Sequence, residues 1–338
     1  MQLQGIFSIR FILGGLIFIG FIVFYWQSLS FERFVDTPIN WPDKNQALVV
    51  EKGNGLNKLA SQWYQQDVIT SEFYLKLFAY LNPEFKQVKV GEYQIENGET
   101  PRTLLTKLKE GKVIQYAFTI VEGTNKWQLI DLLKEEPNLI FDLAEDSAEQ
   151  IKQLNLDWSN IEGWFYPDTY YFSKGTSALE LLKRANQKMR EVLEQEWQNR
   201  AVGLPYKNPY EALIMASIVE KETGIPSERD MIAGVFIRRL EKRMRLQTDP
   251  TIIYGIGPDF NGDITFKDLR TPTPYNTYVI KGLPPTPIAM PGRAAIHAAL
   301  NPADGSALYF VATGNGGHYF SDTLEEHNRA VRKYQLRK

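Results

Sequence analysis

Two glutamates, Glu220 and Glu222, follow a long apolar run and are the residues in this sequence best placed to do acid–base chemistry. Residues 212–219 are apolar at nearly every position, which is typical of a helix that is buried on all sides. Both glutamates fall in the expected last turn, just before Gly224. Apolar surroundings and the negative end of the helix dipole both disfavour an ionised carboxylate and so raise its pKa. A carboxylic acid that is still protonated near neutral pH is what general acid catalysis requires.

A second explanation of the two glutamates involves no catalysis. Both can be solvated residues of the last turn, paired with Lys221 or Arg229. Residues two apart on a helix point about 200° apart, so the two carboxylates are expected to have different roles in either case. Spacing alone does not choose between a solvated pair and a catalytic acid.

The segment that follows favours a site. Ser227 is expected to cap a second helix over residues 228–244, which ends in a basic run. Residues 246–251 (LQTDPT) then form a polar loop between this helix pair and an apolar stretch. Asp249 precedes a proline and is therefore expected to be extended. Polar loops that are held on rigid elements often carry sites, so Gln247 and Asp249 are candidates to support a site at the two glutamates.

Several long motifs occur in a fixed order: VEKETGIPSERD, RLQTDPTIIYG, PYNTY, GLPPTPIAMPG and GGHYF. Together they resemble the endolytic murein transglycosylase (YceG-like) family, whose members cut peptidoglycan glycan strands at the outer face of the cytoplasmic membrane. The resemblance covers nearly the whole chain. It implies that the second glutamate of the E-K-E triplet, Glu222, is the catalytic acid and base. We further predict Glu220, Gln247, Asp249, Tyr254, Asn276 and Tyr278 to bind the substrate or support the site.

The reaction implied by the resemblance needs one carboxyl group and neither a metal nor another cofactor. Glu222 would protonate the glycosidic oxygen between N-acetylmuramic acid and N-acetylglucosamine. It would then take the proton of the muramyl 6-hydroxyl, which attacks C1 and closes a 1,6-anhydro ring. A hydrolase normally needs a second carboxylate, for which Asp249 or Glu220 would serve, so a muramidase is the first alternative. A non-catalytic glycan-binding scaffold is the second.

A further acidic and aromatic cluster occurs at residues 161–170 (IEGWFYPDTY) and matches the E-G-W-F-x-P-D-T motif of the family. Aromatic faces with nearby carboxylates suit pyranose rings, so Glu162 and Asp168 are candidates for substrate contact. A packed domain boundary explains the same residues equally well.

Two proline-rich segments, 271–278 and 282–292, are expected to form stiff loops because proline fixes φ. The family pattern places them around the substrate cleft. Residues 309–312 and 318–320 are predicted to form a hairpin. Residues 321–334 are expected to form a closing helix, for which Thr323 and Glu326 suggest a capping box.

Residues 11–31 contain no charged side chain and are long enough to cross a bilayer. We expect an uncleaved membrane anchor, although a cleaved signal peptide is the alternative. Because Arg10 precedes the span, residues 1–10 are predicted to be cytoplasmic and the bulk of the chain to lie outside the cytoplasm. This corresponds to a single-pass protein of the bacterial inner membrane. Residues 32–46 are predicted to be a linker.

Residues 47–155 contain a strand, a glycine turn and an amphipathic helix three times. Such units resemble LysM-like modules, which bind glycans that contain N-acetylglucosamine. A structural platform without sugar binding is the alternative. Exposed aromatic residues could stack on sugars: Trp63, Tyr64, Tyr93 and Trp127. Residues 156–338 are then the predicted catalytic domain, and the whole chain is predicted to be an α+β protein.

Composition excludes several other functions. The net charge of −2 indicates no nucleic-acid partner, and the absence of cysteine excludes thiol catalysis. The three histidines do not form an H-E-x-x-H motif, so a zinc site is not expected. The expected partners are glycan strands, a lipid bilayer and, by the resemblance, peptidoglycan synthases such as penicillin-binding proteins.

Overall fold

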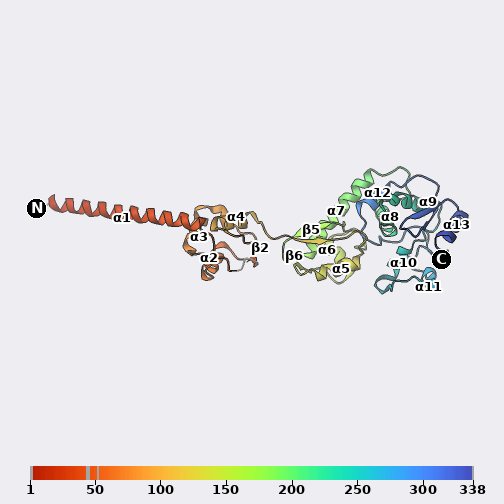
Figure 1. The fold of residues 1–338 in the computed structure, drawn as a ribbon, viewed down its shortest axis with the longest axis horizontal. Helices are drawn as coiled ribbons and strands as arrows, with labels where there is room; N and C mark the ends of the chain where they lie inside the picture. The colour runs from red at the N-terminus through yellow and green to blue at the C-terminus, as the bar shows by residue number, and fades with distance from the viewer. Residues whose placement is uncertain (1–2, 43–45, 52, 337–338) are drawn as a thin grey trace. The chain divides into compact units, whose positions relative to one another are not determined.

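The computed structural model describes residues 3–42, 46–51 and 53–336. Met1 and Gln2 of the predicted cytoplasmic segment lie outside the described residues, as do residues 43–45 of the predicted linker. The chain divides into two compact units, Met1–Tyr116 and Ala117–Lys338, whose elements are labelled in Figure 1. Both units combine helices with small two-stranded sheets, which agrees with the predicted mixture of helix and strand.

The first helix is longer than the predicted span. Helix α1 covers Leu3–Asp36, and within it Gly14–Asp36 is long and apolar enough to cross a membrane, with a mean hydropathy of 1.6. The predicted linker start is therefore wrong, because residues 32–36 are still helical. The physical reason is that Phe34 and Val35 are buried in the core of the first unit, so packing extends the helix beyond its charge-free part.

The rest of the first unit confirms two of the predicted strand–turn–helix units. Strands β1 and β2 pair antiparallel, with Leu48 opposite Tyr93. Thr100 caps helix α4 with a capping box. Trp63 and Tyr93 are buried core residues, so they are not exposed sugar platforms, whereas half of Tyr64 is exposed. The elements are β1 (Leu48–Val50), α2 (Leu56–Gln65), α3 (Glu72–Leu81), the 3-10 helix η1 (Pro83–Lys86), β2 (Gly91–Tyr93) and α4 (Pro101–Glu110).

The third predicted unit, a strand followed by α5, belongs to the second compact unit because β3 pairs with β5. The boundary between the units accordingly falls at Tyr116–Ala117, which is earlier than the expected start of the catalytic domain. Trp127, on α5, is partly buried. The elements here are β3 (Tyr116–Thr119), α5 (Lys126–Glu135), β4 (Leu139–Ile140), α6 (Ser147–Leu154), β5 (Thr169–Phe172), β6 (Thr176–Ser177) and α7 (Ala178–Gln198).

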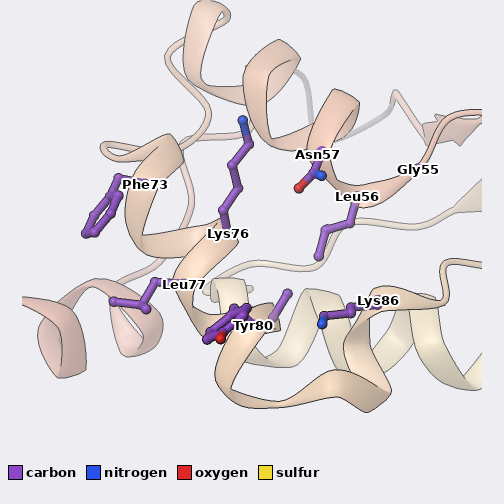
Figure 2. A pocket seen from close by; sticks show the side chains of 9 residues that line it. Gly55, Leu56, Asn57, Phe73, Lys76, Leu77, Tyr80 and Lys86 are labelled. Atoms are coloured by element: carbon purple, nitrogen blue, oxygen red, sulfur yellow. The ribbon is translucent and has the colours of Figure 1, made fainter.

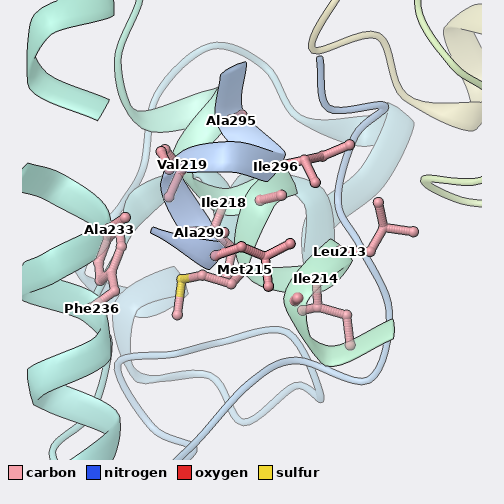
Figure 3. Close-up of a cluster of buried hydrophobic side chains, with 14 of the residues drawn as sticks. Leu213, Ile214, Met215, Ile218, Val219, Ala233, Phe236, Ala295, Ile296 and Ala299 are labelled. Carbon is pink, nitrogen blue, oxygen red and sulfur yellow. The ribbon is translucent and has the colours of Figure 1, made fainter. Parts of the chain in front are cut away.

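The core of the second unit is built around α8 (Pro209–Glu222), which packs against α9 (Arg229–Glu241) and α12 (Arg293–Leu300). Figure 3 shows side chains of all three helices meeting in this core, among them Met215, Phe236 and Ile296. The predicted buried helix is therefore confirmed. Asn208 starts it, because its side chain accepts a hydrogen bond from the backbone N–H of Glu211 at 3.1 Å.

Two local predictions next to α8 are wrong. Ser227 does not cap a helix, because residues Pro226–Glu228 form a 3-10 turn (η2) that leads directly into α9. Asp249 is not extended but is the first residue of α10 (Asp249–Ile256). Thr248 takes the extended position instead, with φ −117° and ψ 126°. A proline in the first helical turn loses no helical hydrogen bond, so Pro250 is accommodated there.

The carboxyl-terminal part matches its predictions. Strands β7 and β8 pair antiparallel, with Tyr309 opposite Ser321. Thr323 caps the last helix, and Glu326 completes the predicted capping box. The remaining elements are the 3-10 helix η3 (Gly257–Asp259), α11 (Phe266–Arg270), β7 (Tyr309–Ala312), β8 (His318–Ser321) and α13 (Leu324–Tyr334).

Candidate active site

Glu222 is the last residue of α8 and lies at the wall of a pocket of about 560 Å³ in the second unit. Burial raises the pKa of its carboxyl group, and the negative charge of Asp249 acts in the same direction. Hydrogen bonding from Thr248 and the nearby His318 and Arg239 oppose this rise without cancelling it. The direction expected from the sequence is therefore confirmed, and Glu222 has a raised tendency to hold a proton.

The pocket brings together four of the predicted site residues from three separate parts of the second unit. Glu222 comes from the end of α8, Gln247 and Asp249 from the segment that enters α10, and Tyr278 from the proline-rich loop that follows. The hairpin β7–β8 and helix α13 also contribute side chains to the lining. The residues that line it are Glu222, Arg239, Gln247, Asp249, Tyr278, Tyr309, Phe310, Val311, Ala312, His318, Leu324, His327, Asn328, Val331 and Gln335.

Thr248 makes the one side-chain hydrogen bond that Glu222 receives among the described residues. Its hydroxyl donates to Glu222 Oε2 at 2.6 Å. Two other buried threonines fix this donor: the backbone N–H of Thr248 donates to Thr277 Oγ1 at 3.1 Å, and Thr251 Oγ1 donates to the carbonyl of Thr248 at 2.7 Å. Within the described residues, no hydrogen bond engages the other carboxylate oxygen, Oε1. The carboxylate is held in one orientation with one oxygen free.

Gln247 reaches the pocket through an uncommon backbone conformation. Its φ is +51°, in the left-handed region that residues with a Cβ rarely adopt. The backbone N–H of Gln247 donates to the carbonyl of Thr277 at 3.2 Å, which ties this conformation to the neighbouring loop. Strained backbone of this kind is concentrated at functional sites, and here it sits directly before the residue that holds Glu222.

Asp249 and Tyr278 form a pair beside Glu222. The hydroxyl of Tyr278 donates to Asp249 Oδ1 at 2.7 Å. Burial raises the pKa of Tyr278, and the carboxylate of Asp249 raises it further, so the hydroxyl stays protonated at all working pH values. This pair places a second carboxylate in the pocket, already engaged as a hydrogen-bond acceptor.

Arg239 supplies a buried positive charge at the same pocket. It is 6% exposed, and its guanidinium donates to the carbonyls of Leu308 at 2.6 Å and Leu246 at 2.7 Å. These contacts join α9 to the start of β7 and to the segment before Thr248. Burial lowers the pKa of Arg239, and the nearby Tyr309, Tyr278 and Glu222 counteract that shift. Arg239 therefore both supports the walls and balances their negative charge.

His318 is held at the pocket by Glu228, from the 3-10 turn before α9. One oxygen of Glu228 accepts from the backbone N–H of His318 at 2.9 Å, and the other contacts His318 Nδ1 at 2.7 Å. Both side chains are nearly buried, at 14% and 12% exposed. The carboxylate fixes the ring orientation, which leaves Nε2 as the other polar atom of the ring.

Glu220 points away from this pocket, as the spacing of the two glutamates predicts. Its Oε2 accepts from the backbone N–H of Gly292 at 2.9 Å, directly before α12, and its Oε1 lies 3.6 Å from the guanidinium of Arg229. Burial raises the pKa of Glu220, and the nearby Glu122 adds to the rise. The carboxylate sits at the amino-terminal end of α12, where a negative charge is favourable. Its contacts are those of a residue that positions α12.

Glu162 and Tyr254 lie in a separate buried cluster. Glu162 is fully buried, and its Oε2 accepts from the backbone N–H of Lys126, the first residue of α5, at 3.0 Å. Burial raises the pKa of Glu162 to about 7. Tyr254 packs between the rings of Trp127 and Tyr275, each with a centroid distance of 4.9 Å. Neither Glu162 nor Tyr254 lines the pocket of Glu222, so this cluster supports the fold around α10.

The two remaining candidates are also outside the pocket. Asn276 is 1% exposed, and its amide donates to the backbone carbonyls of Asp268 at 2.9 Å and Thr271 at 2.8 Å. It therefore holds the loop that carries Tyr278. Asp168 forms an ion pair with Lys188 of α7, which lowers the pKa of Asp168. Both groups of this pair are well exposed, so it is a surface contact.

Sequence reasoning missed several of the residues that shape the pocket. Thr248 stood inside the motif LQTDPT, but its partner Thr277 is far away in the sequence. Arg239 lies in the basic run at the end of the second predicted helix and His318 in the GGHYF motif, and the sequence predicted a pocket role for neither. Within the described ranges, no cluster of three or more acidic or histidine side chains that could hold a metal ion is found.

The role of Thr248 leads to a prediction on pH dependence. Thr248→Val keeps the shape of the side chain but removes the hydroxyl that favours the ionised form of Glu222. Because the pKa of Glu222 then rises, the alkaline limb of kcat/KM against pH should move to higher pH, by about one unit for a hydrogen bond to a charged group. Thr248→Ser keeps the donor and is the matched control. A limb that stays in place in Thr248→Val would show that this hydrogen bond does not tune Glu222.

Comparison with known proteins places this chain in a family. The chain matches the YceG-like family over residues 48–333. An endolytic murein transglycosylase of Bacillus subtilis (strain 168) is 32% identical over 314 residues, which are 84% of this chain and 83% of the relative. Another, from Streptococcus pneumoniae serotype 2 (strain D39 / NCTC 7466), is 32% identical over 182 residues, which are 52% of this chain and 32% of the relative.

A solved structure supports the same grouping. A crystal structure of a YceG-like protein from Listeria monocytogenes matches with a TM-score of 0.52 at 32% identity, and the match covers 84% of this chain and 98% of the other. The resemblance that the sequence motifs carry is therefore confirmed over most of the chain. By its match over residues 48–333 and by these relatives, the chain belongs to the YceG-like family.

Proposed function

We propose that this chain is a membrane-anchored lytic transglycosylase that cuts peptidoglycan strands internally and leaves 1,6-anhydro-N-acetylmuramic acid ends. The general activity is that named for its relatives, which are endolytic murein transglycosylases. The observation that carries the proposal is the state of Glu222: a carboxyl group with a raised pKa, open to a pocket and held through one oxygen by Thr248.

The proposed reaction uses Glu222 twice. Protonated Glu222 donates its proton to the glycosidic oxygen while the bond from that oxygen to C1 of the muramyl residue breaks. The 6-hydroxyl oxygen of the same muramyl residue forms a new bond to C1, and the ionised Glu222 accepts the proton that this hydroxyl loses. Atoms and charge balance without water, and Glu222 ends the cycle protonated. Burial raises the pKa of Glu222 and the hydrogen bond from Thr248 limits the rise. A pKa near the working pH suits a group that must act first as an acid and then as a base.

A hydrolase is the second candidate, because the pocket contains another carboxylate. Asp249 lines the same pocket as Glu222, and hydrolases of glycosides normally use two carboxyl groups. Asp249, however, already accepts the hydroxyl of Tyr278. This engagement favours a role in fixing the pocket wall over activation of water, so the transglycosylase is the better-supported reaction.

The activity is tested with the purified full-length protein and purified murein. Internal cleavage should shorten the glycan strands early, with few disaccharides released, as chromatography of the strands after removal of the peptides would measure. Binding to murein without any shortening of strands would reject the enzyme in favour of the glycan-binding scaffold.

The membrane anchor is part of the proposal and has its own prediction. Side chains between Leu16 and Trp26 on α1 are exposed and apolar, and Arg10 precedes the charge-free span. A reporter fused after Lys338 that works only outside the cytoplasm should therefore be active, and a reporter that works only inside should be silent. The opposite pattern would reverse the proposed topology. Glycan contact by the LysM-like region and binding to peptidoglycan synthases stay predictions from the resemblance.

A further inference from the structure

Helix α3 of the first unit has two apolar faces, and only one of them is covered. Leu75, Phe78 and Ala79 are buried in the core of the unit. On the other face, Phe73 is 67% exposed, and Tyr80 and Leu81 are 71% and 58% exposed. Residues spaced by four and seven positions lie on one side of a helix. A continuous apolar face of this kind on a soluble surface is uncommon and indicates a contact.

Figure 2 shows this face from close by. Phe73 and Leu77 project from the same side of α3, and Tyr80 follows one turn further along. The face borders a hollow of about 700 Å³ that also includes Leu56 of α2. The ammonium group of Lys86 lies 5.3 Å from the centre of the Tyr80 ring. The apolar surface thus has a positive charge at its rim.

The part of α1 that lies beside this face of α3 indicates what covers the face. A second hollow, of about 640 Å³, is lined by Phe24 and Gln27 of α1 together with Phe73, Leu77 and Leu81 of α3. The hydroxyl of Tyr74, next to Phe73, donates to Gln27 Oε1 at 2.5 Å. Phe73 therefore lies beside the part of α1 where the exposed apolar stretch of α1, which ends at Trp26, gives way to Gln27.

We infer that the exposed face of α3, defined by Phe73, Leu77, Tyr80 and Leu81, docks into the outer interface of the lipid bilayer that α1 crosses. This inference rests on the membrane anchor proposed above. Aromatic and aliphatic side chains with a lysine at the rim have the composition of segments that lie in the interface between water and lipid. The docking holds the first unit on the membrane surface by two attachments, α1 and α3.

Geometry favours lipid over a protein partner at this face. The side chains at the border with α1, Phe24 and Gln27, belong to or directly follow the stretch that the anchor places in lipid. A second copy or another protein covering Phe73 would have to displace the lipid that surrounds this part of α1. Lipid needs no such rearrangement, because it already surrounds the span on which α3 packs.

The chain contains no cysteine, so single spin labels test the inference without altering other positions. Full-length Phe73→Cys and Leu81→Cys are labelled with a nitroxide and reconstituted into vesicles of phosphatidylcholine and phosphatidylglycerol. The label's relaxation by oxygen, which concentrates in lipid, is compared with relaxation by a water-soluble nickel chelate. Phe18→Cys, on α1, is the lipid control. Val90→Cys, an exposed apolar position directly before β2, is the matched control for water.

The expected result is that labels at 73 and 81 respond to oxygen as the label at 18 does, and that the label at 90 responds to the nickel chelate. If the label at position 18 reports lipid while the labels at 73 and 81 respond to the nickel chelate as the label at 90 does, docking is overturned and the anchor stands. If the label at position 18 also reports water, the anchor and the docking both fail. If 73 is shielded from both reagents and shows dipolar coupling between copies, the face binds a second copy and the lipid assignment is overturned.

Discussion

Glu222→Gln should reduce cleavage of murein to near the limit of detection. The amide keeps the size of the side chain and can still accept from Thr248, but it can neither donate an acidic proton nor accept one as a base. General acid–base catalysis typically raises a reaction rate by about 10²–10⁴-fold, and here one residue serves both steps. Folding should be retained, because a neutral amide at this position costs less than a buried charge. The rate of strand shortening measures the effect, and the thermal unfolding temperature checks the fold.

Glu220→Gln is the matched control for this result. Its carboxylate contacts the backbone N–H before α12 and the guanidinium of Arg229, and it does not line the pocket. The amide keeps an acceptor for Gly292, so activity should fall only in part. Wild-type turnover in Glu222→Gln, or complete loss in Glu220→Gln with Glu222→Gln still active, would contradict the assignment of the acid and base.

Phe236→Ala should give a large loss of stability in the second unit. Phe236 is fully buried on α9, where it packs against α8 and α12 (Figure 3) and meets the ring of Phe310 edge to face at a centroid distance of 5.7 Å. Removal of a buried phenyl ring lowers the free energy of unfolding by about 3–5 kcal/mol, because the favourable transfer of its apolar surface out of water is lost and a cavity remains. Equilibrium unfolding in urea, followed by tryptophan fluorescence, measures the loss.

Phe266→Ala is the control for burial, since the same side chain on α11 is 80% exposed. Its effect should stay within about 0.5 kcal/mol, as for surface substitutions that leave caps and buried contacts intact. Equal destabilisation by the two substitutions would show that the α8–α9–α12 core does not carry the stability of this unit.

Local sequence patterns predicted those features that depend on neighbours in the chain. The apolar run before Glu220 predicted a buried helix because its pattern alone requires burial on all sides. The capping box at Thr323 was recognisable because all its hydrogen bonds lie within one turn. The opposite directions of Glu220 and Glu222 follow from helix geometry, and their separate contacts agree with it.

Features that depend on distant residues could not be predicted in this way. Thr248 orients Glu222 only because Thr277, which lies in a different loop, accepts the backbone N–H of Thr248. The boundary between the two compact units at Tyr116–Ala117 follows from the pairing of β3 with β5. These strands lie far apart in the sequence, so local patterns do not predict that they pair. Asp249 is helical rather than extended, because the preference of a residue before proline yields to the helix that begins there.

The proposed reaction differs from hydrolysis in one observable respect, the fate of water. Murein is digested with the purified full-length protein in water enriched in oxygen-18, and the new glycan ends are analysed by mass spectrometry. The proposed mechanism predicts 1,6-anhydro ends that are lighter than reducing ends by one water molecule and carry no oxygen-18. New reducing ends that contain oxygen-18 would contradict it and identify the enzyme as a hydrolase.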